Sequence, residues 1–179
     1  VPLMALSADC PAVLVYHPPQ LPSEKTQPRS CTPNCQPRAV LGIAHAGWRG
    51  SVAGIVGRLI DVMIEHYGCD RTCLLAGISP SAGPCCYEVK EDVIRLAALR
   101  WPQHAAYLTA RGGRTYLDLW AVLAAQLAAG GIDAARQSIA RHCTICDERF
   151  FSYRRDGPQT GHAALIAAIA EESPAGQTH

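Results

Sequence analysis

Residues 39–68 read AVLGIAHAGWRGSVAGIVGRLIDVMIEHYG and join a strand, a glycine-rich turn and a helix. The first part, Ala39 to His45, is a mostly apolar run typical of a buried strand. After Gly50, apolar side chains recur every three or four residues, which predicts an amphipathic helix ending near Gly68. This strand–helix step is typical of an α/β or mixed α+β domain.

Strand-like and helix-like segments alternate on both sides of this unit. Residues 18–38 are rich in proline and polar residues, which predicts a long surface loop, and residues 79–86 form a proline–glycine turn. The last apolar segment is ambiguous, because its alanines also suit a helix. We expect one domain, residues 1–179, in which mixed β-sheets pack against helices: strands at 12–16, 73–78, 116–118, 138–143 and 162–170, and helices at 90–100 and 119–129.

Composition excludes several function classes. The 179 residues carry a net charge of about +1, so no strong field recruits nucleic acid. No apolar run approaches the ~20 residues of a membrane span. Nine cysteines, an odd number, favour a reducing, cytoplasmic compartment over a disulfide framework. We therefore expect a cytoplasmic protein with a small-molecule substrate, and a monomer or weak homodimer.

Cys10 and His45 each lie next to an end of a predicted buried strand. Thiolate and imidazole are ligands that zinc and copper accept, and catalytic zinc takes three protein ligands with one open position. Only two such ligands are evident from the pattern. The same pair could instead form a nucleophilic dyad, or be a core cysteine and a hydrogen-bonded histidine.

Two arginine-bearing segments are candidate anion sites. Arg49 and Gly50 stand where a helix begins, and backbone N–H groups with a guanidinium suit phosphate or carboxylate. An ordinary strand–helix turn with a solvated arginine is the alternative. In residues 150–157, FFSYRRDG, three aromatic residues precede two arginines and could stack a planar ring and hold an anion. An edge strand with a charged turn is the alternative, which the pattern alone slightly favours.

Cysteine spacing indicates a third kind of site. Cys31/Cys35 and Cys69/Cys73 are spaced C-x3-C, and Cys143/Cys146 are spaced C-x2-C. Two such pairs could form a four-thiolate zinc knuckle, although no paired C-x2-C signature is present. The vicinal pair Cys85–Cys86 lies in a turn, and we expect it to serve packing.

Five motifs in order give the sequence a resemblance to a known family. They are SADC at 7–10, HAGWRG at 45–50, GPCCYEV at 83–89, YLDLW at 116–120, and CT followed by FFSYRRDG within 143–157. The chain resembles the YfiH-like proteins over residues 8 to about 170. That family is described as laccase-like multicopper polyphenol oxidases and as purine nucleoside phosphorylases with adenosine deaminase activity.

The resemblance implies a metal site at Cys10 and His45, holding zinc, with copper as the alternative. The family's third ligand is a histidine in an upstream VHG motif, which has no counterpart here, so we expect an N-terminal segment of the family fold to be missing. His17 is a candidate substitute. Two other motifs depart from the family: its GPSIGP turn reads SPSAGP at 79–84, and its TGR reads TGH at 160–162. The second change removes one candidate anion-binding guanidinium.

The resemblance also implies an activity. We expect phosphorolysis of adenosine, inosine, guanosine or methylthioadenosine with phosphate, and zinc-dependent deamination of adenosine. The implied catalytic residues are Asp9, Arg49, Glu88, Asp118 and Arg154. The implied substrate- and phosphate-binding residues are Arg49, Gly50, Phe151, Tyr153, Arg154 and Arg155.

Other function classes stay open at this point. One is a copper-dependent polyphenol oxidase, although none of the seven histidines forms the H-x-H motif of laccases. Another is a catalytically incomplete binding module, because a third metal ligand is missing. The family's link to editing of peptidoglycan precursors leaves a hydrolytic role as a further alternative.

Overall fold

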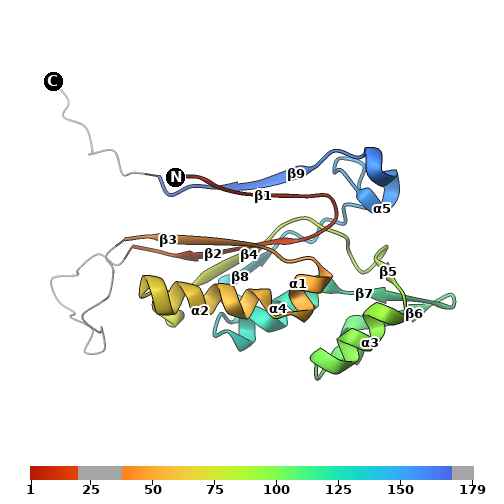
Figure 1. Ribbon diagram of the computed structural model, residues 1–179, viewed down its shortest axis with the longest axis horizontal. Coiled ribbons are helices and arrows are strands. Elements are labelled where there is room, and N and C mark those ends of the chain that lie inside the picture. The colour runs from red at the N-terminus through yellow and green to blue at the C-terminus, as the bar shows by residue number, and fades with distance from the viewer. Residues whose placement is uncertain (20–37, 171–179) are drawn as a thin grey trace.

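The computed structural model describes residues 1–19 and 38–170, which form a mixed α/β fold in layers (Figure 1). The central sheet has four strands, in the order β3, β2, β4, β8. β2 is antiparallel to both neighbours, and β4 and β8 are parallel. The bounds are Val40–His45 for β3, Ala12–His17 for β2, Leu75–Ile78 for β4 and Gln137–Ile139 for β8. The mixed fold and the strands at 12–16 and 39–45 are thus confirmed. The strand predicted at 73–78 is confirmed from Leu75 onward, because Cys73 ends a 3-10 helix.

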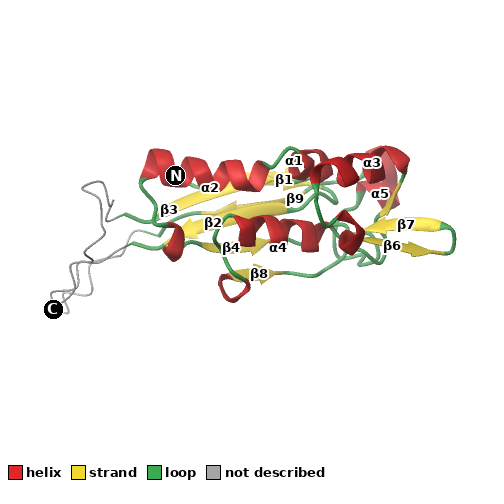
Figure 2. Ribbon diagram, turned by 90° about the horizontal axis from the view of Figure 1, so that it is seen from below, coloured by secondary structure: helices red, strands yellow, loops and turns green. Residues whose placement is uncertain are grey.

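Helices cover one face of this sheet (Figures 1 and 2). They are α1 (Trp48–Val52), α2 (Ile55–Tyr67) and α4 (Leu119–Ala129). The single helix predicted from Gly50 to Gly68 is wrong, because Gly54 adopts a left-handed φ of 78° and separates α1 from α2. The predicted end at Gly68 is confirmed, since that glycine is also left-handed and caps α2.

The core lies between the two long helices and the sheet. Val13 and Val15 of β2 are fully buried, as expected for a central strand that neighbours cover on both edges and both faces. Helix α4 begins after Asp118, whose carboxylate accepts the Ala121 N–H at 2.9 Å, and ends at Gly130. Its bounds match the sequence prediction. The core side chains from the helices include Val56, Ile60, Met63, Val122, Leu123 and Leu127.

An antiparallel ribbon lies on the opposite face of the sheet (Figure 1). It pairs β1 (Leu3–Ser7) with β9 (Ala163–Ala167), so the two ends of the described chain run side by side. β1 was not predicted, because five residues between a terminus and a turn give too short a pattern. For β9 the structure decides between strand and helix in favour of a strand.

A small third sheet extends from one end of the molecule (Figure 2). Its strands, in the order β5, β7, β6, are Glu88–Val89, Arg114–Leu117 and Leu108–Arg111, and α3 (Glu91–Arg100) follows β5. α5 (Tyr153–Asp156) occupies the segment for which an edge strand was an alternative, and that strand is therefore wrong. Short 3-10 helices lie at Arg71–Cys73, His104–Tyr107, Ala134–Arg136 and Gly157–Gln159.

The structure shortens one predicted element and leaves another mostly outside the described residues. The extended segment expected at 138–143 stops after β8, because Arg141 adopts a left-handed φ of 51°. Most of the loop expected at 18–38, with Cys31 and Cys35, lies outside the described residues. Among the residues that are described, no helix is both long and apolar enough to cross a bilayer.

Candidate functional site

Four chain segments emerge at the same end of the central sheet. Antiparallel pairing sets Ala12 opposite His45 and Val13 opposite Ile78, so β2 begins where β3 and β4 end. The N–H of Ala140, just after β8, donates to the Ile78 carbonyl at 3.0 Å, which brings the fourth segment to this edge. The motifs that are far apart in the sequence therefore meet here.

Cys10 and His45 come together at Gly47. The position that a Cβ would take on Gly47 lies 2.8 Å from Cys10 Sγ and 3.7 Å from His45 Nε2. The imidazole Nδ1 lies 3.2 Å from the Leu6 carbonyl oxygen of β1. A proton on Nδ1 donates to that carbonyl and leaves the Nε2 lone pair for a metal. Thiol and imidazole nitrogen thus face one small space, as a shared ion requires.

These two donors fit zinc or copper in kind, but they do not complete a site. Within residues 1–19 and 38–170, no third histidine, cysteine or carboxylate forms a ligand group with them. His17, the candidate substitute, is at the opposite end of β2. Its Nε2 accepts the Asp70 N–H at 3.1 Å, so it serves the fold and not this site.

A pocket of about 450 Å³ begins at Trp48, the residue that directly follows Gly47; neither Cys10 nor His45 lines it. Arg49, Lys90 and Arg154 contribute three cationic groups to its wall, and Trp48 and Tyr87 contribute two rings. The remaining lining residues are Glu88, Val89, Asp92 and Val93. α1, β5, α3 and α5 all supply lining residues, so the pocket forms only in the folded chain.

Two arginines in this wall are held in place. The Arg49 guanidinium lies 4.2 Å from the centre of the Trp48 ring, a cation–π contact. Arg154 lies 5.2 Å from the Tyr87 ring centre and donates to the Glu88 carbonyl oxygen at 2.8 Å. Both cations are thereby orientated with donors to spare for an anion.

Tyr87 connects the pocket to the cysteine. Burial raises the pKa of its phenol to about 12, as does the nearby Cys10, while Arg154 and Arg49 oppose the rise. Burial and the neighbouring Asp9 likewise raise the pKa of the Cys10 thiol above its ordinary value. The phenol therefore lies within electrostatic reach of both the thiol and the two guanidinium groups.

Asp9 links the segments that surround Cys10 through hydrogen bonds. Its two carboxylate oxygens accept the Thr144 hydroxyl at 2.6 Å and the Arg154 N–H at 2.7 Å. Its backbone is left-handed, with a φ of 83°, and its carbonyl accepts the Ala82 N–H. This residue links the Cys10 turn to two other segments, and both carboxylate oxygens are used in doing so.

Other residues expected in the site lie elsewhere. Arg155 donates to the carbonyl oxygens of Thr144, Ile145 and Phe150, and Asp118 caps α4. Gly50 packs α1 against the His45 carbonyl. Phe151 contacts Gly161, and Tyr153 is exposed. Of the predicted residues, only Arg49, Glu88 and Arg154 line the pocket.

Six of the nine residues that line the pocket were not among the predicted site residues: Trp48, Tyr87, Val89, Lys90, Asp92 and Val93. Trp48 adjoins the predicted Arg49 within HAGWRG, Tyr87 adjoins the predicted Glu88 within GPCCYEV, and Lys90 directly follows that second motif. Attention to aromatic neighbours of the candidate cations could have found the two rings, since rings and guanidinium groups pair readily.

A second group of potential metal ligands includes Cys86, the residue directly before Tyr87 of the pocket. The Sγ atoms of Cys85, Cys86, Cys143 and Cys146 all lie within 4.8 Å of one another. Burial raises the pKa of Cys86 to about 11, and burial also raises that of Cys85. Burial acts on Cys143 too, but hydrogen bonds from the backbone of Cys146 and Gly83, together with weaker ones from Cys85 and Ile145, give a net lowering of its pKa. The packing role expected for Cys85–Cys86 is wrong for Cys85, which is exposed.

Comparison with known proteins identifies the family. The sequence model of the multi-copper polyphenol oxidoreductase laccase family matches residues 34–170. The chain belongs to this family. The resemblance inferred from the five motifs is thus confirmed, and most of the matched range carries the fold described above.

Relatives with names and structures agree with this assignment. The chain is 32% identical over 136 residues, 74% of its length, to the purine nucleoside phosphorylase YlmD of Geobacillus stearothermophilus, covering 50% of that protein. It is 31% identical to adenosine deaminase RL5 of an unknown prokaryotic organism, with coverage of 68% of this chain and 47% of RL5. The crystal structure of Bacillus licheniformis hypothetical protein YfiH matches with a TM-score of 0.75 at 30% identity, covering 92% of this chain and 56% of YfiH. The chain spans about half the length of each of these proteins.

Proposed function

We propose that this chain binds purine nucleosides and phosphate and takes part in their phosphorolysis. The observation that supports the proposal best is the pocket whose wall combines Arg49, Lys90 and Arg154 with the Trp48 and Tyr87 rings. Its volume of about 450 Å³ lies within the ~300–1,000 Å³ range of small-molecule sites. Relatives named purine nucleoside phosphorylase are consistent with such a substrate.

In this proposal the cations bind phosphate and the rings bind the base. Arg49 and Arg154 hold the phosphate dianion, since guanidinium groups match its oxygens in pairs. Trp48 or Tyr87 stacks against the purine. A phosphate oxygen then forms a bond to ribose C1′ while the bond from C1′ to the purine nitrogen breaks, and the electron pair leaves with the base. Glu88, one of two carboxylates in the pocket lining with Asp92, is proposed to bind ribose hydroxyls or to carry a proton to the departing base.

Cys10 and His45 are the residues that would hold the family's metal. A bound zinc or copper ion would supply Lewis-acid activation beside the pocket. The chain's own contribution there is to orientate the imidazole through the Leu6 carbonyl and to hold the Cys10 turn through Asp9. Adenosine, inosine, guanosine and methylthioadenosine are the nucleosides proposed.

Phosphorolysis by the full chain tests this proposal. Release of free purine base from inosine or adenosine should require inorganic phosphate. Arg49→Ala should lower kcat/KM by about 10²-fold, the effect typical of removing one charged donor from a reacting centre. Arg58→Ala, which removes an exposed arginine on α2, is the matched control and should leave the rate unchanged. Equal rates for the two variants would exclude a phosphate role for Arg49.

Deamination of adenosine is the second candidate activity. A relative named adenosine deaminase and the paired Cys10 and His45 favour it. Conversion of adenosine to inosine should be lost in Cys10→Ala if the metal serves this reaction. Oxygen uptake with a phenol in the presence of copper tests the polyphenol oxidase activity that the family name describes. No activity in any of the three assays, with ligands still bound, would favour a binding module.

A further inference from the structure

We propose that Cys85, Cys86, Cys143 and Cys146 form a second metal site, a closed four-thiolate zinc centre separate from the Cys10–His45 pair. Cysteine thiolates in a set of four are the ligands of structural zinc. The four sulfur atoms lie within 4.8 Å of one another, and Cys10 is not among them. The site would thus be complete from this chain's described residues alone.

The distances fit a tetrahedral ion. Zinc–sulfur bonds of about 2.3 Å in a tetrahedron hold the sulfurs ~3.8 Å apart. The Sγ atoms of Cys85 and Cys146 are 3.8 Å apart, although they are 61 positions apart in the sequence. The most distant pair of the four would need to approach by only about 1 Å, which side-chain rotation can supply.

The backbone around the sulfurs is already cross-linked. Ser81 N–H donates to the His142 carbonyl at 3.1 Å, and Thr144 N–H donates to the Ser81 carbonyl at 3.0 Å. Gly83 N–H donates to the Cys143 sulfur at 3.2 Å. Outer hydrogen bonds of this kind orientate metal ligands and tune their affinity. The two loops therefore present their sulfurs to one another before any ion arrives.

Burial supports a structural ion with a route of entry. Cys143 is buried at the base of the cluster, whereas Cys85 and Cys146 are exposed at its mouth. The Cys143-x2-Cys146 turn is closed by the Asp147 N–H, which donates to the Cys143 carbonyl at 3.0 Å. The C-x2-C spacing is the one that zinc knuckles use.

The position of the cluster indicates a structural role for the ion. Cys86 directly precedes Tyr87 of the pocket, and Cys143 directly precedes Thr144, which donates to Asp9 beside Cys10. An ion held by both loops would fix the distance between the pocket wall and the Cys10 turn. The proposed site is thus a clip that positions the functional site without contacting its substrate.

Metal content measured on the reduced full chain tests the proposal. Zinc should bind in two classes, tightly at the four-thiolate cluster and weakly at the two-ligand Cys10–His45 pair. Cys10→Ser should therefore retain the cluster zinc, and Cys146→Ser should lose it. Loss of a direct ligand should weaken binding by more than ~100-fold, beyond the 10–100-fold effect of losing an outer partner. Cys73→Ser, in the 3-10 helix at the far end of β4, is the matched control and should retain both classes.

Cobalt substitution gives a second measurement, made first in Cys10→Ser, where the four cluster cysteines are unaltered. Co²⁺ in Cys10→Ser should show the thiolate charge-transfer bands and the intense visible bands of a tetrahedral four-sulfur site. When Cys85→Ser or Cys146→Ser is added to Cys10→Ser, the chain should lose these cobalt bands while still unfolding cooperatively. Both positions are exposed. Unchanged cobalt spectra in these variants, or absence of the bands from Cys10→Ser itself, would overturn the proposal. A cluster found oxidised to disulfides after reduction and zinc loading would overturn it as well.

Discussion

At the scale of single residues, Gly47 decides how close Cys10 and His45 can come. It lies directly between the histidine-bearing strand and α1, and the missing Cβ leaves room for the Cys10 sulfur. Its φ of −58° and ψ of 167° are open to any residue. The requirement for glycine here is therefore space at the site, and not backbone conformation.

Gly47→Ala should remove metal binding by the pair while the fold persists. The added Cβ would meet Cys10 Sγ at 2.8 Å and displace it from the imidazole. Overpacking of this kind costs about 1–3 kcal/mol of unfolding free energy. Gly57→Ala in the first turn of α2 is the control, because its Cβ meets no atom within 4 Å and alanine favours a helix. Zinc titration of both variants, in a chain lacking Cys146, checks this. Undiminished zinc binding by Gly47→Ala would show that thiol and imidazole do not share an ion.

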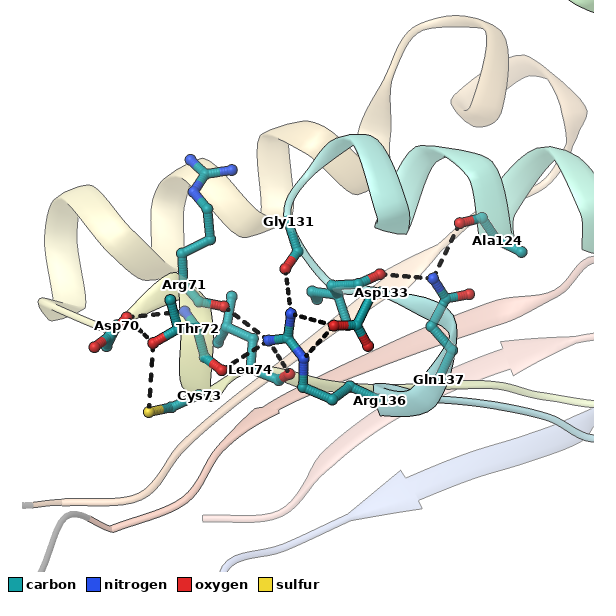
Figure 3. A network of polar contacts seen from close by, with 11 residues as sticks. Asp70, Arg71, Thr72, Cys73, Leu74, Ala124, Gly131, Asp133, Arg136 and Gln137 are labelled. Carbon is teal, nitrogen blue, oxygen red and sulfur yellow. Dashed lines mark hydrogen bonds and ion pairs between the residues drawn. The ribbon is translucent and has the colours of Figure 1, made fainter.

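At the scale of elements, Arg136 joins the starts of two parallel strands. Figure 3 shows its guanidinium among carbonyl oxygens of the segment that leads into β4 and of the turn after α4. It donates to Thr72 O at 2.8 Å and to Gly131 O at 2.6 Å, and it pairs with Asp133. Gln137, the next residue, donates to the Ile132 carbonyl at 2.7 Å. Parallel strands lack a tight turn between them, so this network takes over the alignment of β8 on β4.

Arg136→Ala should destabilise the fold by about 2 kcal/mol. A hydrogen bond to a charged group contributes roughly 1.5–3 kcal/mol, and the truncation leaves several carbonyls without their donor. Urea unfolding followed by circular dichroism measures the change. Arg58→Ala is the control, because it removes an exposed arginine from α2; it should shift the unfolding free energy by less than ~0.5 kcal/mol. A similar small shift for Arg136→Ala would mean that water replaces the network at no cost.

At the scale of the whole molecule, the sequence predicts local elements well and their assembly less well. The core strands and α4 have patterns long enough to identify, and Asp118 with Gly130 marks the ends of α4. Gly54 could be a helix residue or a left-handed break, and the sequence pattern is compatible with both. The same holds for function: the motif histidine, cysteine and arginines could be named from the sequence. The meeting of Cys85 with Cys146 depends on the parallel pairing of β4 with β8, which spacing does not reveal.

The whole fold should gain stability from the proposed cluster zinc. An ion that binds only the folded chain adds RT ln(1 + [zinc]/Kd), about 2.7 kcal/mol at 100 times Kd, less any binding to unfolded thiols. In the Cys10→Ser background, thermal unfolding with zinc should therefore move to higher temperature, and a chelator should reverse the shift. Adding Cys146→Ser to that background should abolish the shift, whereas adding Cys73→Ser should not. Equal stabilisation of the two double variants would mean that zinc acts through scattered surface groups and not through the cluster. The loops after β4 and β8 would then be held together by their backbone hydrogen bonds, without a bridging ion.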